Sequence, residues 1–469
     1  MRLEYKYIVA LVSVFGIFMN LIDLTIVNVA MPVLANDLQA SPSQVQWVLT
    51  GYLVALAVCI PISGWAGDKF GMKRLFVISL ILFTLGSTLC AFAWNVESLI
   101  FFRLVQGAAG GLLTPVGTAL VFRAFPNNER SKASALIVIP TTIAPASGPL
   151  LGGIILNHLS WEWIFLVNIP VGIAGIIAAS LLLREWKDDN PGQLDVPGFI
   201  LASGGLGTLL YGVSRIGSSG LNDLQGWIWG IIGIAVLGIF VLFETKTKDP
   251  LIDVRLFQDR MFARANAAQF AGFLGFSGGL FLLPFFLQGV RGMTPLEAGL
   301  MTFPQAIGVA TMAPIIARLY PRIGPRRLIM AGLTLASITT LPFVFMDIDT
   351  NLWFLRGMMY IRGLGFGLLL VPVQAAVFAT ISISATGRAS AVFNATRQVA
   401  MSFGTAICAA VLTSRLSTYS AERLDPTQAI AATNAFNEAF LASLILIAFG
   451  VLVASFIRDK DAAATMQRS

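Results

Sequence analysis

The chain has 469 residues, of which 56% are hydrophobic and only 12% are charged. Soluble domains carry charge on about a quarter of their residues, so this composition excludes a soluble globular protein and predicts an all-α polytopic membrane protein. The net charge of +7 does not predict a nucleic-acid partner, because the basic residues gather on one side of the predicted membrane spans.

Cysteine and histidine are too scarce and too scattered for metal or nucleophilic chemistry. Cys59, Cys90 and Cys408 lie far apart in apolar segments, without the CxxC spacing of metal or redox sites. His158 is the only histidine, which leaves little from which to build a metal cluster or a Ser-His-Asp triad. The sequence also lacks a GxxxxGK[ST] loop for ATP. We therefore expect no enzyme activity, no metal and no cofactor.

Apolar runs of about 20 residues predict fourteen membrane-spanning helices. Their expected ranges are 8–31, 45–66, 76–94, 98–122, 133–157, 163–183, 197–214, 227–243, 265–288, 297–318, 328–346, 352–379, 390–413 and 438–457. An even number places both termini on one side. If the termini lie in the cytoplasm, 23 of the 31 lysines and arginines fall on the cytoplasmic side, four fall on the outer side, and four lie within spans. By the positive-inside rule we expect a multi-pass protein of the bacterial plasma (inner) membrane with both termini in the cytoplasm.

The first predicted span is too long for a secretory signal, so we expect a retained helix. Asp23 lies near its middle, where a charge costs several kcal/mol, and an ionisable residue inside a span indicates function. Asn20 lies three residues earlier on the same helix face, which predicts a bundle interior or a water-filled cavity. The alternative is that Asp23 caps a broken helix or pairs with an arginine to hold the bundle together.

The second predicted span leads into GWAGDKFGMKR, residues 64–74. Gly64 and Gly71 permit close helix approach and a tight turn, and Asp68 offers an anion to neighbouring cations or to a helix N-terminus. Lys73 and Arg74 are expected at the cytoplasmic surface. The alternative is a simple border turn rich in cations.

The fourth predicted span contains LIFFRLVQGAAGG, residues 99–111. Arg103 lies only a few residues into this span. One interpretation is therefore that its long side chain extends back to the outer membrane interface.

The fifth predicted span contains PTTIAPASGPLLGG, residues 140–153. Prolines remove backbone donors and small residues let helices touch. The stretch thus predicts a kinked, closely packed pivot, made by Pro145, Gly148, Pro149, Gly152 and Gly153.

An internal repeat divides the chain into two halves. GWAGDKFGMKRL at 64–75 aligns with ARLYPRIGPRRL at 317–328, where Pro321 takes the place of Asp68. Two spans after each copy come VQGAAGGLL, 105–113, and IRGLGFGLL, 361–369. We expect six-helix halves at 1–190 and 251–469, two additional helices at 191–250 packed at the periphery, and a substrate site between the halves.

These motifs, with WEWIFLVNIP at 161–170 and NATRQ at 394–398, resemble those of the fourteen-helix drug:proton antiporters of the major facilitator superfamily. The resemblance covers nearly the whole chain and implies the major facilitator fold. It implies that residues 64–74, with Asp68 as the anion, latch the halves shut on the cytoplasmic side. It also implies that residues 140–153 mark an antiporter, although Ala144 stands where glycine is usual.

For Arg103 the resemblance implies a role in proton transfer together with Asp23. A cation brought near a carboxylate favours its charged form, whereas removal from water favours the protonated form. A conformational change that alters their separation would therefore load and release a proton.

Six residues are candidate substrate contacts, namely Asn20, Gln269, Phe273, Gln305, Asn394 and Arg397. Those of the ninth and tenth spans recur at roughly helical spacing, and a pocket with aromatic side chains suits varied substrates. The alternative for the phenylalanines of these spans is that they face lipid or the core.

We expect a secondary antiporter that exports amphipathic, often cationic, drugs or toxic small molecules in exchange for protons by alternating access. The alternatives are export of an endogenous metabolite, lipid or siderophore, and a channel or transceptor on the same scaffold. The expected partners are the small-molecule substrate, protons as coupling ion and the lipid bilayer. We expect a monomer and leave an unidentified accessory partner open.

Overall fold

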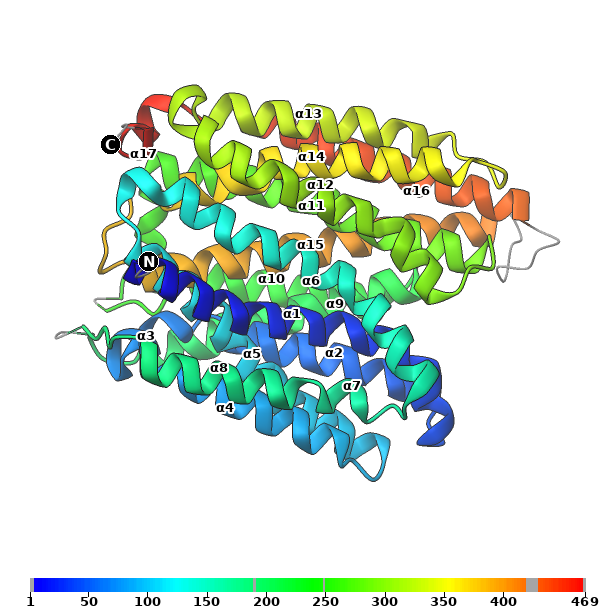
Figure 1. Ribbon diagram of the computed structural model, residues 1–469, viewed down its shortest axis with the longest axis horizontal. Coiled ribbons are helices and arrows are strands. Elements are labelled where there is room, and N and C mark those ends of the chain that lie inside the picture. Colours follow the sequence, from blue (N-terminus) through cyan, green and yellow to red (C-terminus); the bar gives the residue numbers. More distant parts are fainter. Residues whose placement is uncertain (1–3, 189–190, 248, 419–428, 467–469) are drawn as a thin grey trace.

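Helices account for almost all of the computed structural model (Figure 1), which describes residues 4–188, 191–247, 249–418 and 429–466. The α-helices are α1 (Tyr5–Asp37), α2 (Pro42–Cys59), α3 (Ser63–Phe70), α4 (Met72–Ala91), α5 (Val96–Ala124), α6 (Arg130–His158), α7 (Trp163–Leu166), α8 (Asn168–Leu182), α9 (Val196–Ser219), α10 (Leu224–Glu244), α11 (Arg260–Gly289), α12 (Pro295–Ile323), α13 (Pro325–Val344), α14 (Leu352–Val377), α15 (Thr386–Thr418), α16 (Ala429–Ala454) and α17 (Ala463–Met466). Short 3-10 helices cover Asn127–Glu129, Val254–Gln258 and Asp459–Ala462.

Thirteen of the described helices are long and apolar enough to cross a membrane, and α2 with α3 supplies a fourteenth candidate. The pair bends by 56° between Gln44–Cys59 and Ser63–Phe70. Pro61 lies in the break. Proline has no backbone N–H to donate, so it interrupts the helical hydrogen bonds and accounts for the bend. Each of the fourteen predicted spans therefore has a counterpart, and the predicted range 45–66 combines α2 with the start of α3.

The helices form two bundles, and both termini lie at the same end of the molecule (Figure 1). Helices α1 to α8 make the first bundle and α11 to α16 the second. We call the end that carries the termini the terminal end. Four of the cations assigned to the two sides lie outside the described residues, namely Arg2, Lys248, Arg423 and Arg468.

The two additional helices differ in their surroundings. Helix α9 packs against α2 and α15, where Leu209 and Val213 form a small buried cluster with Ala406. Helix α10 packs along α9 and turns large apolar side chains outward, among them Ile231 and Leu242. The expected peripheral position therefore fits α10, whereas α9 bridges the two bundles.

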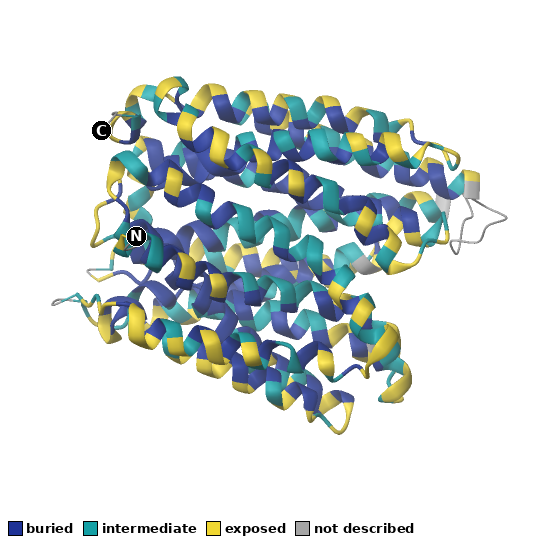
Figure 2. Ribbon diagram, in the orientation of Figure 1, coloured by how far each residue is buried: buried dark blue, intermediate teal, exposed yellow. Residues whose placement is uncertain are grey.

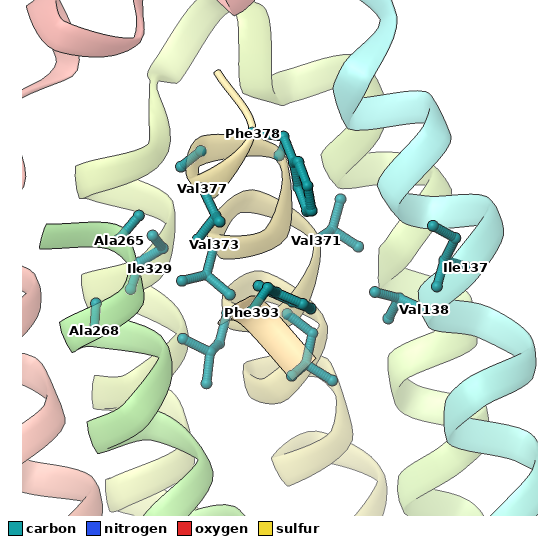
Figure 3. Close-up of a cluster of buried hydrophobic side chains, with 14 of the residues drawn as sticks. Ile137, Val138, Ala265, Ala268, Ile329, Val371, Val373, Val377, Phe378 and Phe393 are labelled. Carbon is teal, nitrogen blue, oxygen red and sulfur yellow. The ribbon is translucent and has the colours of Figure 1, made fainter. Parts of the chain in front are cut away.

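The largest cluster of buried apolar side chains joins the bundles toward the terminal end. Ile137 and Val138 of α6 belong to the same cluster as Val371 of α14 (Figure 3). The rings of Phe122 and Phe378 stack across the bundles with centroids 4.1 Å apart. Figure 2 shows buried residues where helices face one another and exposed residues around the outside. The exposed apolar side chains suit a protein that is surrounded by lipid, where every backbone polar group is satisfied inside a helix.

Candidate functional site

A buried carboxylate lies in the interior of the first bundle. Asp23 of α1 has no exposed surface. Nη1 of Arg103 lies 2.5 Å from its Oδ2, and the side-chain amides of Gln106 and Asn168 each donate to its Oδ1 at 2.9 Å. One cation and two neutral donors, supplied by α5 and α8, therefore hold both oxygens of the carboxylate.

Arg103 points inward and does not extend to the membrane interface. It is fully buried. Its Nε donates to the carbonyl oxygen of Val48 at 3.3 Å, and its Nη1 also donates to Oε1 of Gln106 at 2.8 Å. The guanidinium carbon lies 3.9 Å from the centroid of the Tyr52 ring, a cation–π contact that gains strength away from water. Among the described residues, Arg103 is the one charged side chain paired with Asp23, and it lies inside the bundle.

Asn20 joins the same polar region through Tyr52. The hydroxyl of Tyr52 donates to Oδ1 of Asn20, and Nδ2 of Asn20 donates to Oγ1 of Thr114 at 3.0 Å. Gly110 makes room for this arrangement, because a side chain there would collide with Asn20. Asn20 is thus engaged within the first bundle.

Three members of this network are residues that the sequence did not single out, namely Gln106, Asn168 and Tyr52. A signal for Gln106 exists, since it follows Arg103 by three residues and shares its helix face. Asn168 stands at the start of α8 as a polar residue in an apolar stretch. Gln106 and Asn168 converge on Asp23, and Tyr52 on Asn20 and Arg103, only through the packing of α1, α2, α5 and α8, which no local pattern encodes.

Asp68 links the two bundles at the terminal end. Its Oδ1 lies 2.8 Å from Nη2 of Arg123, and its Oδ2 lies 4.0 Å from Nε of Arg388 at the start of α15. The same Nη2 of Arg123 donates to the carbonyl oxygen of Ser384 at 3.3 Å. Gly64 permits this approach, because a Cβ atom there would lie 3.1 Å from the backbone of Arg388. Asp68 itself is buried.

Lys73 and Arg74 meet a different carboxylate. Gly71 has a φ of +99°, a conformation that favours glycine and forms the turn between α3 and α4. The backbone N–H groups of Lys73 and Arg74 then donate to Glu185 at 2.9 and 3.2 Å. Glu185 therefore caps the N-terminus of α4.

The second copy of the motif repeats this cap. Gly324 has a φ of +87°, and the backbone N–H of Arg326 donates to Asp459 at 2.9 Å. Pro321 offers no anion at the position of Asp68. The repeat therefore keeps the turn and the helix cap in both halves and the ion pair only in the first.

Further hydrogen bonds close the terminal end. They run from Oγ of Ser131 to the carbonyl of Ala317 (3.0 Å), from Oγ of Ser134 to that of Val371 (2.8 Å), from Oγ of Ser390 to that of Pro115 (2.7 Å), and from Nη2 of Arg130 to that of Ile381 (3.0 Å). All four join the first bundle to the second. Opening this end would break them together with the Asp68 contacts.

Helix α6 lies between α1 and α12. It contains all three prolines of its motif, Pro140, Pro145 and Pro149. Gly148 lies so close to Thr25 of α1 that a side chain would collide, and a Cβ atom at Gly152 would lie 3.2 Å from Ile26. On the other side, a Cβ atom at Gly299 of α12 would lie 3.1 Å from Pro149, and one at Gly153 would lie 3.6 Å from Leu296. The small residues thus set a close helix contact on both faces.

Five of the six candidate substrate contacts are buried in this conformation, namely Asn20, Gln269, Phe273, Gln305 and Asn394. Nε2 of Gln269 donates to the carbonyl of Phe393 at 2.9 Å, and Nδ2 of Asn394 donates to that of Ser390 at 2.9 Å. Arg397 is partly exposed in the interior of α15. It is the one member of this set that keeps a partly exposed surface in this conformation.

The sequence matches known transporters. The family model of the Major Facilitator Superfamily matches residues 13–405. The chain is 37% identical over 406 residues to the multidrug resistance protein B homolog of Mycobacterium tuberculosis (strain H37Rv), which covers 86% of this chain and 75% of the relative. It is 32% identical over 412 residues to the uncharacterized MFS-type transporter YhcA of Bacillus subtilis (strain 168), covering 88% and 77%. It is 36% identical over 331 residues to the putative multidrug resistance protein MdtD of Escherichia fergusonii, covering 70% of each.

The fold matches a solved structure. The crystal structure of the human organic anion transporter MFSD10 superposes with a TM-score of 0.67 over 95% of this chain and 100% of that one. The two sequences are 17% identical, so this likeness concerns the fold alone.

Proposed function

The chain belongs to the Major Facilitator Superfamily, and from this premise we propose that it is an antiporter that exports amphipathic small molecules, drugs among them, in exchange for protons. The predicted family and fold class are confirmed, and the family consists of transporters rather than enzymes. Two relatives carry names for multidrug resistance, which supports drugs over an endogenous metabolite, lipid or siderophore as cargo.

The observation that carries the proposal is the fully buried pair of Asp23 and Arg103. Protonation of the carboxyl group would remove the charge that balances Arg103 and leave an uncompensated cation in a dry interior. Asp23 therefore cannot take up a proton and stay ion-paired with Arg103 at the same time. A conformational change that separates the two side chains favours uptake, and one that restores the pair favours release.

Alternating access would use the contacts at the terminal end as its gate. We assign residues 1–190 and 251–469 to the two moving halves and residues 191–250 to an insert. By the positive-inside rule we place the terminal end in the cytoplasm of a bacterial cell. Asp68, Arg123 and Arg388 then hold the cytoplasmic side closed in the conformation described, and exported cargo leaves this state on the opposite side.

Purified protein in proteoliposomes with a trapped pH-sensitive dye tests the proposal. A panel of positively charged, negatively charged and neutral drugs is added while a pH gradient is imposed. We expect drug-dependent proton flux with the wild-type protein, and drug accumulation against its gradient only while the pH gradient lasts. A channel would pass drug without concentrating it, and that result would contradict antiport.

A further inference from the structure

The predicted spans contain an excess of positive charge. Asp23 is the one carboxylate inside them, since Glu297 and Glu438 lie at the ends of theirs. Four arginines lie within spans. Arg356 stands near the outer end of its span over the Trp353 ring, which leaves Arg103, Arg362 and Arg397. After Asp23 and Arg103 have paired, two cations in the second half remain without a balancing carboxylate.

Packing contacts fix the register between the first helices of the two halves. A Cβ atom at Gly16 would lie 3.4 Å from Leu113, and one at Gly272 would lie 2.6 Å from Leu369. Leu113 and Leu369 close the matching motifs 105–113 and 361–369. Gly16 of α1 is therefore the counterpart of Gly272 in α11.

The same register shows that the second half has no carboxylate at the position that corresponds to Asp23. Seven residues beyond each glycine, Asp23 corresponds to Gly279, and the motifs align Gln106 with Arg362. A side chain at Gly279 would collide with the guanidinium of Arg362. Where the first half places a carboxylate beside an amide, the second half places a guanidinium beside a glycine.

Arg362 finds little compensation in the second bundle. It is fully buried, and its Nε and Nη2 have no hydrogen-bond partner in the structure. Nη1 donates to Oε1 of Gln305 at 3.5 Å, and the guanidinium carbon lies 5.3 Å from the centroid of the Phe366 ring. These neutral contacts leave its charge as a source of positive potential in a medium of low dielectric constant.

Arg397 presents a second cation where a ligand can reach it. It is partly exposed, and within the described part of the chain no carboxylate lies within salt-bridge distance of it. Ser390 and Asn394 share its face of α15 at helical spacing, and Ser390 donates to the carbonyl of Pro115 in the first bundle. Arg397 therefore projects from the face of α15 that meets the first half, beyond the closed contacts.

Within the residues that the structure describes, a cationic cargo would meet no free carboxylate beside Arg397. Both oxygens of Asp23 are held by Arg103, Gln106 and Asn168, and the side chain has no exposed surface. An anion, by contrast, would compensate Arg397 with charge-assisted hydrogen bonds.

We propose that Arg397 binds the negatively charged group of the exported molecule, so that the cargo of this transporter is an amphipathic organic anion. The proposal rests on the proposed export function and names its substrate class. Met401, one turn along the same face and partly buried against the main apolar cluster, offers an adaptable surface for the apolar part. The charge distribution thus reverses the preference for cations that the family resemblance suggests.

Equilibrium binding to the purified protein in lipid nanodiscs tests the proposal. The probes are three fluorescent molecules with one apolar body: pyrenebutyrate, its neutral amide, and the corresponding pyrenebutyl-trimethylammonium cation. We expect wild-type protein to bind the carboxylate about tenfold or more tightly than the cation. Arg397→Gln should abolish this difference, and Arg397→Lys should retain part of it, because the ammonium keeps the charge and loses the planar fork.

Arg356→Gln is the matched control, since Arg356 stands near the outer end of α14 over the Trp353 ring. It should leave the preference unchanged. Tighter or equal binding of the cation, no measurable binding of the carboxylate, or an unchanged preference in Arg397→Gln would overturn the proposal. Proton-flux measurements on the same protein keep the two conclusions separate: selective anion binding without proton exchange would contradict antiport and retain the anion site.

Discussion

Nη1 of Arg103 lies 2.5 Å from Oδ2 of Asp23, and neither side chain has any exposed surface. The two residues come from α1 and α5, so the contact depends on how these helices pack. Removing one partner of such a buried pair typically costs about 3–5 kcal/mol, because the remaining charge is left uncompensated. The pair is therefore the point at which a proton would have the largest effect on the conformation of the first bundle.

Asp23→Asn should abolish proton-coupled export while the protein still inserts into the membrane. The amide oxygen can accept a hydrogen bond from Arg103, but the amide cannot carry a proton through the cycle. Proton flux in proteoliposomes measures the effect, and Asp37→Asn, an exposed position at the end of the same helix, serves as control. Export at the wild-type rate by Asp23→Asn would remove Asp23 from the coupling scheme.

Arg103→Ala should block proton release while leaving equilibrium cargo binding largely intact. Without the guanidinium the protonated carboxyl group is favoured, so exchange should require a more alkaline medium. Arg103→Lys should rescue only partly, because a single ammonium cannot reproduce the contacts with Asp23, Gln106 and Val48. Binding and the pH dependence of exchange are measured on the same preparation.

Arg356→Ala controls for the loss of an arginine near the end of a span. Should Arg103→Ala lose cargo binding and keep the wild-type pH dependence, Arg103 would belong to the substrate pocket instead.

The sequence predicts elements whose pattern is local. All fourteen spans have counterparts, and Gly71 and Gly324 adopt the expected turn conformation at equivalent positions. Contacts between segments that are distant in the chain cannot be predicted from the sequence in this way. Nothing near Glu185 or Asp459 indicates that each caps a helix more than 100 residues away, and nothing in α9 indicates that it bridges α2 and α15.

The candidate site shows the same division. Asp23 stands out because a charge in an apolar run is costly, whereas the burial of Gln269 and Asn394 depends on the conformation that the two halves adopt. A helical pattern gives the face on which a residue lies. It does not give the neighbour that covers this face.

Asp68→Ala should increase the population of conformations that are open at the terminal end, since it removes the anion between Arg123 and Arg388. We expect a shift of about 1–3 kcal/mol, equivalent to roughly 5- to 150-fold. A cysteine introduced at Ser131, which is buried at the closed contact with α12, reports the change as faster labelling by a membrane-impermeant maleimide.

Labelling is measured in a background that lacks Cys59, Cys90 and Cys408. Lys69→Ala, an exposed neighbour on α3, should leave the rate unchanged. Equal rates for Asp68→Ala and the background would make Asp68 a border residue without a role in the gate.

Glu244→Gln should stabilise the protein, because Glu244 is a buried carboxylate that lies near a second one, Asp195, at the base of α9 and α10. Both are buried, both approach Gly198, and each has one carboxylate oxygen without a hydrogen-bond partner. Glutamine keeps an oxygen for the backbone N–H of Ile252, which donates to Glu244 at 3.2 Å, and its NH2 group can donate to Asp195.

We expect the melting temperature of Glu244→Gln to rise by about 1–3 °C, equivalent to roughly 1 kcal/mol. The rise should be larger at pH 8.5 than at pH 6, because burial penalises the charged form of Glu244 and the lower pH favours its protonated form. Glu97→Gln, an exposed position at the start of α5, should change neither value. A lower melting temperature for Glu244→Gln at both pH values would mean that the charge of Glu244 is compensated and that the pair stabilises this end of the insert.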